Sequence, residues 1–160
     1  MRVFIDAGFH FLPEDMDTIQ ARAMLYSIAF QESGFQTRNQ FGEGPARSFW
    51  QFEPVGIKGV IEHPSSAYFA KGILGQLYIE IEDAYEAITY SDPLATAFAR
   101  LNLWRLPDAL PEREDVEEGW KQYLEAWKPG IPRPEKWPDS FERGWELALA
   151  EERIQNERVD

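Results

Sequence analysis

Apolar side chains recur at three- or four-residue spacing between residues 14 and 32, and this pattern predicts the first long helix. Positions three and four apart share one face of an α-helix, so the stripe predicts a largely buried helix. Pro13 suits the first turn of such a helix, and Gly34 suits its end. The stripe consists of Met16, Ile19, Ala23, Tyr26 and Phe30.

Similar patterns predict helices over most of the remaining chain. Residues 34–48 contain three glycines and a proline and are expected to form a loop. Four prolines between residues 129 and 138 predict a stiff connector. Residues 1–12 are apolar and aromatic, which favours a short strand or an extended arm. The further helices are expected at residues 54–61, 64–78, 80–88, 93–105, 112–128 and 139–157.

No segment alternates apolar and polar residues well enough to predict a strand. The sequence leaves a small β element open near residues 1–6 or 47–53. The expected architecture is therefore predominantly α-helical, in one domain over residues 1–160. Residues 1–12 would be an N-terminal arm, and residues 130–160 would be the Pro-rich connector and a C-terminal helix.

Composition excludes several classes of protein. No apolar run approaches 18 residues, so insertion into a membrane is not expected. Asp6 and His10 interrupt the first residues, so we expect synthesis in the cytoplasm without a signal peptide. The chain has no cysteine, and His10 and His63 lie far apart in the sequence. No phosphate-binding or dinucleotide-binding motif is present, so neither a metal nor a cofactor is expected.

The net charge of −12 is carried mainly by the second half of the chain. Residues 1–78 contain 6 basic and 8 acidic side chains, whereas residues 79–160 contain 10 basic and 20 acidic ones. An acidic protein repels phosphate backbones, so nucleic acid is not an expected partner. Most of these acids are expected to be solvated helix faces, which salt would screen from a distant cleft.

Two segments carry candidate chemistry. The first predicted helix ends at Glu32, between Phe30 and Phe35. Burial against apolar groups raises the pKa of a carboxyl, which lets it act as a general acid near neutral pH. Taken alone, Glu32 would be an ordinary exposed glutamate in a last helical turn. The second segment, residues 48–54, surrounds Gln51 with aromatic side chains.

Together these segments resemble the soluble lytic transglycosylase and goose-type lysozyme superfamily. That family has a Glu-Ser pair at a helix end, an aromatic residue shortly after it, and a Gly-Leu-Met-Gln-x-x-Pro segment further along. Glu32, Ser33 and Phe35 match the first part, and Gln51 and Pro54 match the Gln-x-x-Pro. The resemblance implies a lysozyme-like helical fold.

The chain is also similar to a group of small phage-encoded proteins of this kind. Their Gly-Pro-Ala-Arg-Ser-Phe-Trp-Gln-Phe run is matched by residues 44–52, and their His-Pro-Ser/Ala-Ser by residues 63–66. On this pattern the resemblance extends from about residue 20 to residues 127–130.

The resemblance implies that Glu32 protonates the β-1,4 bond between N-acetylmuramic acid and N-acetylglucosamine in peptidoglycan, and then acts as a base. In a lytic transglycosylase the 6-hydroxyl of the sugar itself attacks and leaves a 1,6-anhydro product. Ser33 would orient the substrate or Glu32, or simply be a polar residue at a helix end. Gln51 would bind an N-acetyl group or the backbone of Glu32, or fix its own loop.

Four further residues would belong to the same site. Phe35, as the family aromatic, would contact substrate. Phe49 and Trp50 would stack on sugar rings or belong to the core. Arg47 would bind a muramyl carboxylate or form a surface ion pair.

The sequence departs from the family at two places. Ser48-Phe49-Trp50 replaces Gly-Leu-Met, and its bulk would narrow the cleft. The third family motif, Ala-x-Ala-x-Tyr-Asn, is matched at best by residues 97–102. Asn102 is kept as a candidate substrate-binding residue, but Leu101 replaces the tyrosine that would hydrogen-bond the glutamate. Another tyrosine would have to supply that contact, and the sequence does not identify it.

A hydrolase would instead need a second carboxylate, roughly 5–5.5 Å away for retention or 6.5–9.5 Å for inversion. Glu43 and Glu53 are the candidates; Glu43 also suits a solvated loop, and Glu53 also suits a pair with Arg47 or a position in water.

The leading hypothesis is a phage-encoded lytic transglycosylase that acts on peptidoglycan glycan strands. An inactive lysozyme-like structural protein of a phage virion or tail, bound to other virion proteins, is the main alternative. A glycan-binding module is a third. Without a signal peptide, such a product would be packaged in the virion or released to the cell wall.

Overall fold

The computed structural model describes residues 2–40, 42 and 44–157, and these residues are predominantly helical. This confirms the α-helical class that the apolar spacing predicts. Within this part of the chain there are eight α-helices and three short 3-10 helices. They are α1 (Arg2–Phe9), η1 (Glu14–Met16), α2 (Ile19–Ser33), α3 (Pro54–Glu62), α4 (Ala67–Gln76), η2 (Ile81–Asp83), α5 (Ala84–Tyr90), α6 (Asp92–Trp104), α7 (Val116–Trp127), η3 (Pro134–Lys136) and α8 (Trp137–Asn156).

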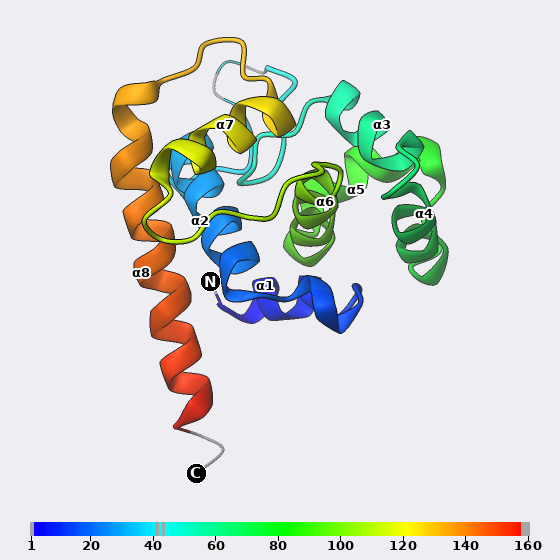
Figure 1. Cartoon of the computed structure of the whole chain (residues 1–160). Coiled ribbons are helices and arrows are strands. Elements are labelled where there is room, and N and C mark those ends of the chain that lie inside the picture. Colours follow the sequence, from blue (N-terminus) through cyan, green and yellow to red (C-terminus); the bar gives the residue numbers. More distant parts are fainter. Residues whose placement is uncertain (1, 41, 43, 158–160) are drawn as a thin grey trace.

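Helices α2 and α8 form the most extensive helix–helix contact of the molecule, and Figure 1 shows them side by side. Gly144 of α8 permits this close approach. A Cβ atom at Gly144 would lie 2.1 Å from Ser27 Oγ and 2.6 Å from the carbonyl oxygen of Ala23, both on α2. The missing side chain at Gly144 therefore sets the distance between the two helices.

The core lies around α2 and α6. Nearly all residues of α2 between Ala21 and Gln31 are buried, and so are all residues of α6 between Leu94 and Leu103. A helix that is surrounded by protein is apolar on most of its faces. This explains why the apolar stripe of α2 is so wide in the sequence.

The expected strand or extended arm at residues 1–12 is wrong. Residues 2–9 form α1, which packs against α6. Ile5 and Phe9 are four residues apart and are both buried, as expected for one face of a helix. Aromatic and β-branched residues favour a strand locally. Here the gain from burying one helical face against α6 outweighs that local preference.

The first long helix begins later than its apolar spacing predicts. Pro13 precedes the short η1, and α2 begins only at Ile19. Thr18 caps this start, because its Oγ1 accepts the N–H of Ala21 at 3.1 Å. The end of the helix, at Ser33, agrees with the prediction.

Three segments that are far apart in the sequence meet at the end of the molecule drawn at the top of Figure 1: the loop of residues 34–40 and 44–53, α7, and residues 128–136. The indole N–H of Trp127 donates to the carbonyl of Trp50 at 2.8 Å and joins the first two. The small β element expected at residues 47–53 is reduced, among the described residues, to isolated bridges of Arg47 with Asn39 and Phe52. None of the described helices is long and apolar enough to cross a membrane.

Candidate active site

Glu32 lies in the last turn of α2, at a position that the helix end holds firmly. Gly34 adopts the left-handed conformation, with φ of 61°, which glycine reaches without steric cost. Its N–H donates to the carbonyl of Phe30 at 3.0 Å, and the N–H of Phe35 donates to that of Ala29 at 3.1 Å. The predicted stop at Gly34 is confirmed, and it sets where the side chain of Glu32 leaves the helix.

A tyrosine from α7 holds the Glu32 carboxyl. The hydroxyl of Tyr123 donates to Glu32 Oε1 at 2.6 Å, across a separation of 91 residues. The ring of Tyr123 is 2% exposed and stacks on Trp137, with centroids 5.2 Å apart. Trp120 packs against it at the same centroid distance. The packed rings leave the hydroxyl little freedom, so Tyr123 is a rigid donor.

The surroundings of Glu32 raise its pKa. Glu32 is half-buried as a residue. Burial is the main cause of the raised pKa, and the nearby negative charge of Glu53 adds to it. The Tyr123 hydrogen bond and the charges of Lys136 and Arg133 lower the pKa of Glu32 without cancelling the effect of burial. Glu32 therefore keeps its proton to a higher pH than an ordinary glutamate, as a general acid must.

Among its described residues, the loop that follows Glu32 has three non-glycine residues in the left-handed conformation. Phe35, Ser48 and Gln51 have φ values of 59°, 64° and 50°. Each such residue costs about 1–3 kcal/mol, and such residues gather at functional sites. Hydrogen bonds from Ser33 Oγ to the Phe49 carbonyl, at 2.8 Å, and from Gln51 Nε2 to the Ser48 carbonyl, at 2.8 Å, hold the loop in this shape.

Ser33 and Gln51 thus take the structural role that the sequence left open beside the substrate-binding one. Ser33 joins the end of α2 to the second motif, and Gln51 fixes its own loop. Each hydrogen bond contributes about 1 kcal/mol. They place the second motif next to Glu32, which is the juxtaposition that the two segments predict.

The aromatic side chains of the second motif belong to the core. Trp50 is 0% exposed, and its indole N–H donates to the carbonyl of Leu25 at 2.8 Å. Phe49 is 5% exposed and stacks on Phe35 with centroids 4.8 Å apart. Neither Phe49 nor Trp50 offers a ring face to a sugar in this arrangement. Half-buried Trp120 and Trp127 on α7 are the large aromatic rings nearer the surface at this end.

Asn102 and Leu101, from the third motif, are both buried. The Asn102 amide N–H donates to the carbonyl of Ala126 at 3.0 Å, and its oxygen accepts from Arg105 at 2.7 Å. These bonds commit Asn102 to the contact between α6 and α7. Leu101 is fully buried in the core. The tyrosine hydroxyl that reaches Glu32 comes from Tyr123 on α7 and not from α6.

Arg47 is used by the loop backbone. Its guanidinium donates to the carbonyls of Gly44, at 2.6 Å, and Ala46, at 3.1 Å. Among the described residues, no ion pair joins Arg47 to Glu53 or to another carboxylate. Glu53 is exposed at the start of α3, close enough for its charge to act on Glu32. Glu43, the other candidate second carboxylate, lies outside the described residues.

Sequence reasoning missed a clamp made by Gln31, the residue before Glu32. Its side chain is 5% exposed; Nε2 donates to the Arg133 carbonyl at 2.9 Å, and Oε1 accepts from Ser140 at 3.0 Å. Lys136 Nζ donates to the Gln31 backbone carbonyl at 3.3 Å. The clamp fastens the Pro-rich connector beside Glu32. Only the position of Gln31 next to Glu32 could have marked it in the sequence.

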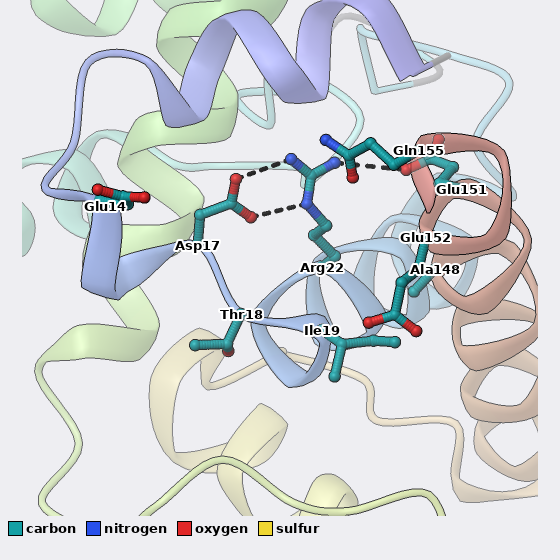
Figure 2. Close-up of a pocket in the computed structure, with 9 residues that line it drawn as sticks. All are labelled: Glu14, Asp17, Thr18, Ile19, Arg22, Ala148, Glu151, Glu152 and Gln155. Atoms are coloured by element: carbon teal, nitrogen blue, oxygen red, sulfur yellow. Dashed lines mark hydrogen bonds and ion pairs between the residues drawn. The ribbon is translucent and has the colours of Figure 1, made fainter. Parts of the chain in front are cut away.

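Two hollows of the described surface lie away from Glu32. One, of about 260 Å³, lies between the start of α2 and α8, and Figure 2 shows Arg22 there between Asp17 and Glu151. The other, of about 480 Å³, is lined by residues of the loop and of α5, including Asn39 and Tyr90. Glu32 lines neither hollow. No group of three or more acidic or histidine side chains suited to a metal occurs within the described residues.

Comparisons with models of protein families, with curated proteins and with solved structures found no match to this chain.

Proposed function

We propose that this protein cleaves peptidoglycan glycan strands as a lytic transglycosylase, on a lysozyme-like fold. The observation that carries the proposal is the Glu32 carboxyl, half-buried, with a raised pKa, and held at 2.6 Å by the hydroxyl of Tyr123. Retaining a proton to a higher pH than an ordinary glutamate and being fixed by a rigid donor are two properties that suit a general acid. The resemblance of Glu32-Ser33 and of Gln51 to the family motifs names the substrate.

In this reaction the Glu32 carboxyl gives its proton to the oxygen of the β-1,4 bond, and the bond from that oxygen to C1 of N-acetylmuramic acid breaks. The 6-hydroxyl of the same sugar then bonds to C1 and returns its proton to the Glu32 carboxylate. The products are a 1,6-anhydro sugar end and a free 4-hydroxyl on N-acetylglucosamine. The raised pKa favours the first step, and the hydrogen bond from Tyr123 stabilises the carboxylate between the steps.

A digestion of purified peptidoglycan, analysed by mass spectrometry, tests the proposal. The wild-type protein is expected to release anhydro-muropeptides, and Glu32→Gln to lose this activity by at least about 100-fold. Glu125→Gln, at an exposed position of α7, is the matched control and should retain it. Reducing-end products would indicate a hydrolase instead, and Glu53→Gln would then identify the second carboxylate.

A second candidate is an inactive structural protein of a phage virion or tail. It is favoured by the burial of Phe49 and Trp50 and by hollows that do not include Glu32. No product from the wild-type protein, together with its retention in purified particles, would replace the enzyme by this candidate. If the enzyme is phage-encoded, we expect it in the virion or released to the cell wall.

A further inference from the structure

Two cationic residues, Arg133 and Lys136, lie at the candidate site and take no part in the proposed proton transfers. Arg133 precedes η3 and Lys136 ends it. The N–H of Lys136 donates to the carbonyl of Arg133 at 3.2 Å, which closes one 3-10 turn. Lys136 Nζ reaches back to the end of α2, where it donates to the Gln31 carbonyl, and the exposed Arg133 lies at the start of the same turn.

The Gln31 clamp holds this turn against the end of α2. One hydrogen bond joins Gln31 Nε2 to the Arg133 carbonyl, and another joins Lys136 Nζ to the Gln31 carbonyl, at 2.9 and 3.3 Å. The prolines around the turn, at positions 132, 134 and 138, stiffen it further. Arg133 and Lys136 are thus fixed next to the residue that precedes Glu32.

Neither cation has a carboxylate partner within the described residues. Lys136 uses one of its three donors on Gln31, and two remain. Arg133 is exposed and contributes only its backbone to the clamp. Among the described residues of this half, Arg113, Lys121 and Arg143 have acidic partners in Glu142, Glu118 and Asp139, whereas the exposed Lys128 and Arg153 have none. What distinguishes Arg133 and Lys136 from the other unpaired cations is that the Gln31 clamp holds their turn beside Glu32.

We propose that Arg133 and Lys136 form an anion subsite beside Glu32 that binds a carboxylate of the peptidoglycan substrate. This inference rests on the proposed function. A guanidinium matches a carboxylate with two parallel hydrogen bonds, and an ammonium adds a compact charge. Because the protein and the cell wall are both anionic, local cations would also offset their repulsion at the cleft. Two parts of the substrate carry this group: the lactyl group of peptide-free strands and the stem peptides.

The charges at the site agree with this placement. Both Arg133 and Lys136 lower the pKa of Glu32, and Arg133 also lowers that of Tyr123. The two cations therefore lie within electrostatic reach of the reacting groups. A substrate carboxylate bound there would lie close to the scissile bond.

Binding to soluble glycan fragments tests the subsite directly. Titration calorimetry on the Glu32→Gln protein, which leaves the substrate intact, compares peptide-free fragments, peptide-bearing fragments, and each of these with its carboxylates converted to amides. The fragment whose affinity falls on amidation identifies the source of the carboxylate. We expect Arg133→Gln with Lys136→Gln to weaken binding of that fragment roughly tenfold or more. Binding of its amidated form should not change.

Two controls separate charge from structure. Lys71→Gln with Arg153→Gln removes two exposed charges on α4 and α8 and should leave binding unchanged. Lys136→Arg keeps the charge and should restore most of the affinity that Lys136→Gln removes. Equal losses for the native and amidated fragments would overturn the subsite, and so would the absence of binding by any fragment.

Kinetics on intact peptidoglycan distinguish failure of the subsite from failure of the proposed function. If the wild-type protein and the double variant release anhydro-muropeptides with the same KM, the transglycosylase reaction is supported and the anion subsite is refuted. A KM raised roughly tenfold in the double variant, with a smaller change in kcat, supports the anion subsite. If the wild-type protein releases nothing, the proposed reaction falls, and the fragment titration still decides whether the cations bind carboxylates.

Discussion

Individual residues at the site have opposing effects on the pKa of Glu32. Burial and Glu53 favour the protonated carboxyl, whereas the hydrogen bond from Tyr123 and the charges of Lys136 and Arg133 favour the carboxylate. A group that must both give and accept a proton in one catalytic cycle benefits from such a balance. Changing one of these neighbours should shift the pH range of activity, not only its rate.

Tyr123→Phe tests this balance, because it removes one hydroxyl and keeps the stacked ring. Without the donor, the pKa of Glu32 should rise further and the alkaline limb of the pH profile should move to higher pH. The loss of positioning should lower the rate roughly 10- to 100-fold. Tyr68→Phe, an exposed tyrosine on α4, is the control. A lower rate with an unmoved alkaline limb would mean that the Tyr123 hydroxyl positions Glu32 without changing its pKa.

Glu32→Gln should change stability in a pH-dependent way. The pKa of Glu32 is raised in the folded protein, so the folded state holds its proton more tightly than the unfolded state does. Ionisation therefore destabilises the fold as pH rises above the ordinary pKa of a glutamate. Gln does not ionise but still accepts the Tyr123 hydrogen bond. At pH 8 we expect Glu32→Gln to have a higher Tm than the wild-type protein, and at pH 4 we expect the two Tm values to be nearly equal. The same difference in Tm at both pH values would contradict this expectation.

At the level of elements, the contact between α2 and α8 supports the site. Helix α2 carries Gln31 and Glu32 on its last turn, and α8 follows directly on the connector that holds Arg133 and Lys136. The bond from Ser140 of α8 to Gln31 joins the two helices at that end. The spacing of the two helices therefore sets the geometry of the clamp.

Gly144→Ala should disturb this spacing. The added Cβ would meet Ser27 and the carbonyl of Ala23 well below van der Waals distance, and the backbone contact leaves no flexible group to move aside. We expect a loss of about 1–3 kcal/mol in the free energy of unfolding, measured by denaturant titration. Gly72→Ala on α4 meets no atom within 4 Å and should instead stabilise by about 0.5–1 kcal/mol. Equal changes in the free energy of unfolding for Gly144→Ala and Gly72→Ala would contradict the close packing of α2 and α8.

For the molecule as a whole, Arg22 joins parts that the sequence separates widely. Its guanidinium pairs with Asp17 at 2.7 Å, with Asp6 of α1 at 2.7 Å and with Glu151 of α8 at 3.5 Å, as Figure 2 shows in part. Glu151 also accepts the hydroxyl of Tyr26 at 2.6 Å. One side chain of α2 thus ties both ends of the described chain to the core.

Arg22→Met should loosen both ends together. It keeps the aliphatic stem but leaves buried Glu151 without its cation, which we expect to cost roughly 2–3 kcal/mol in unfolding free energy. Hydrogen exchange should show faster opening of α1 and of α8 near Glu151. Arg113→Met, which breaks an exposed pair with Glu142, is the control and should leave the free energy of unfolding nearly unchanged. Unchanged exchange in α1 and α8 would contradict the role of Arg22.

Local pattern was sufficient to place most helices, the stop at Gly34 and the loop that follows. Side-chain spacing and backbone preferences act within a few residues, so the sequence reports them directly. The same pattern is ambiguous where local preference and burial disagree. Residues 2–9 favour a strand by composition, and only their packing against α6 makes them α1. The start of α2 was misplaced for a related reason, since Pro13 serves a separate turn before it.

The candidate site shows the same division. The adjacency of Glu32-Ser33 and of the Gln51 segment could be proposed from the sequence, because each is a short motif. The hydrogen-bond partner of Glu32 could not be proposed from the sequence. Tyr123 lies 91 residues away, and its helical spacing with other apolar residues predicts only a place in the core. Arg133 and Lys136 likewise reach the site only through the Gln31 clamp. Contacts between distant segments depend on how whole helices pack against one another. The spacing of apolar residues along a single helix does not specify that packing.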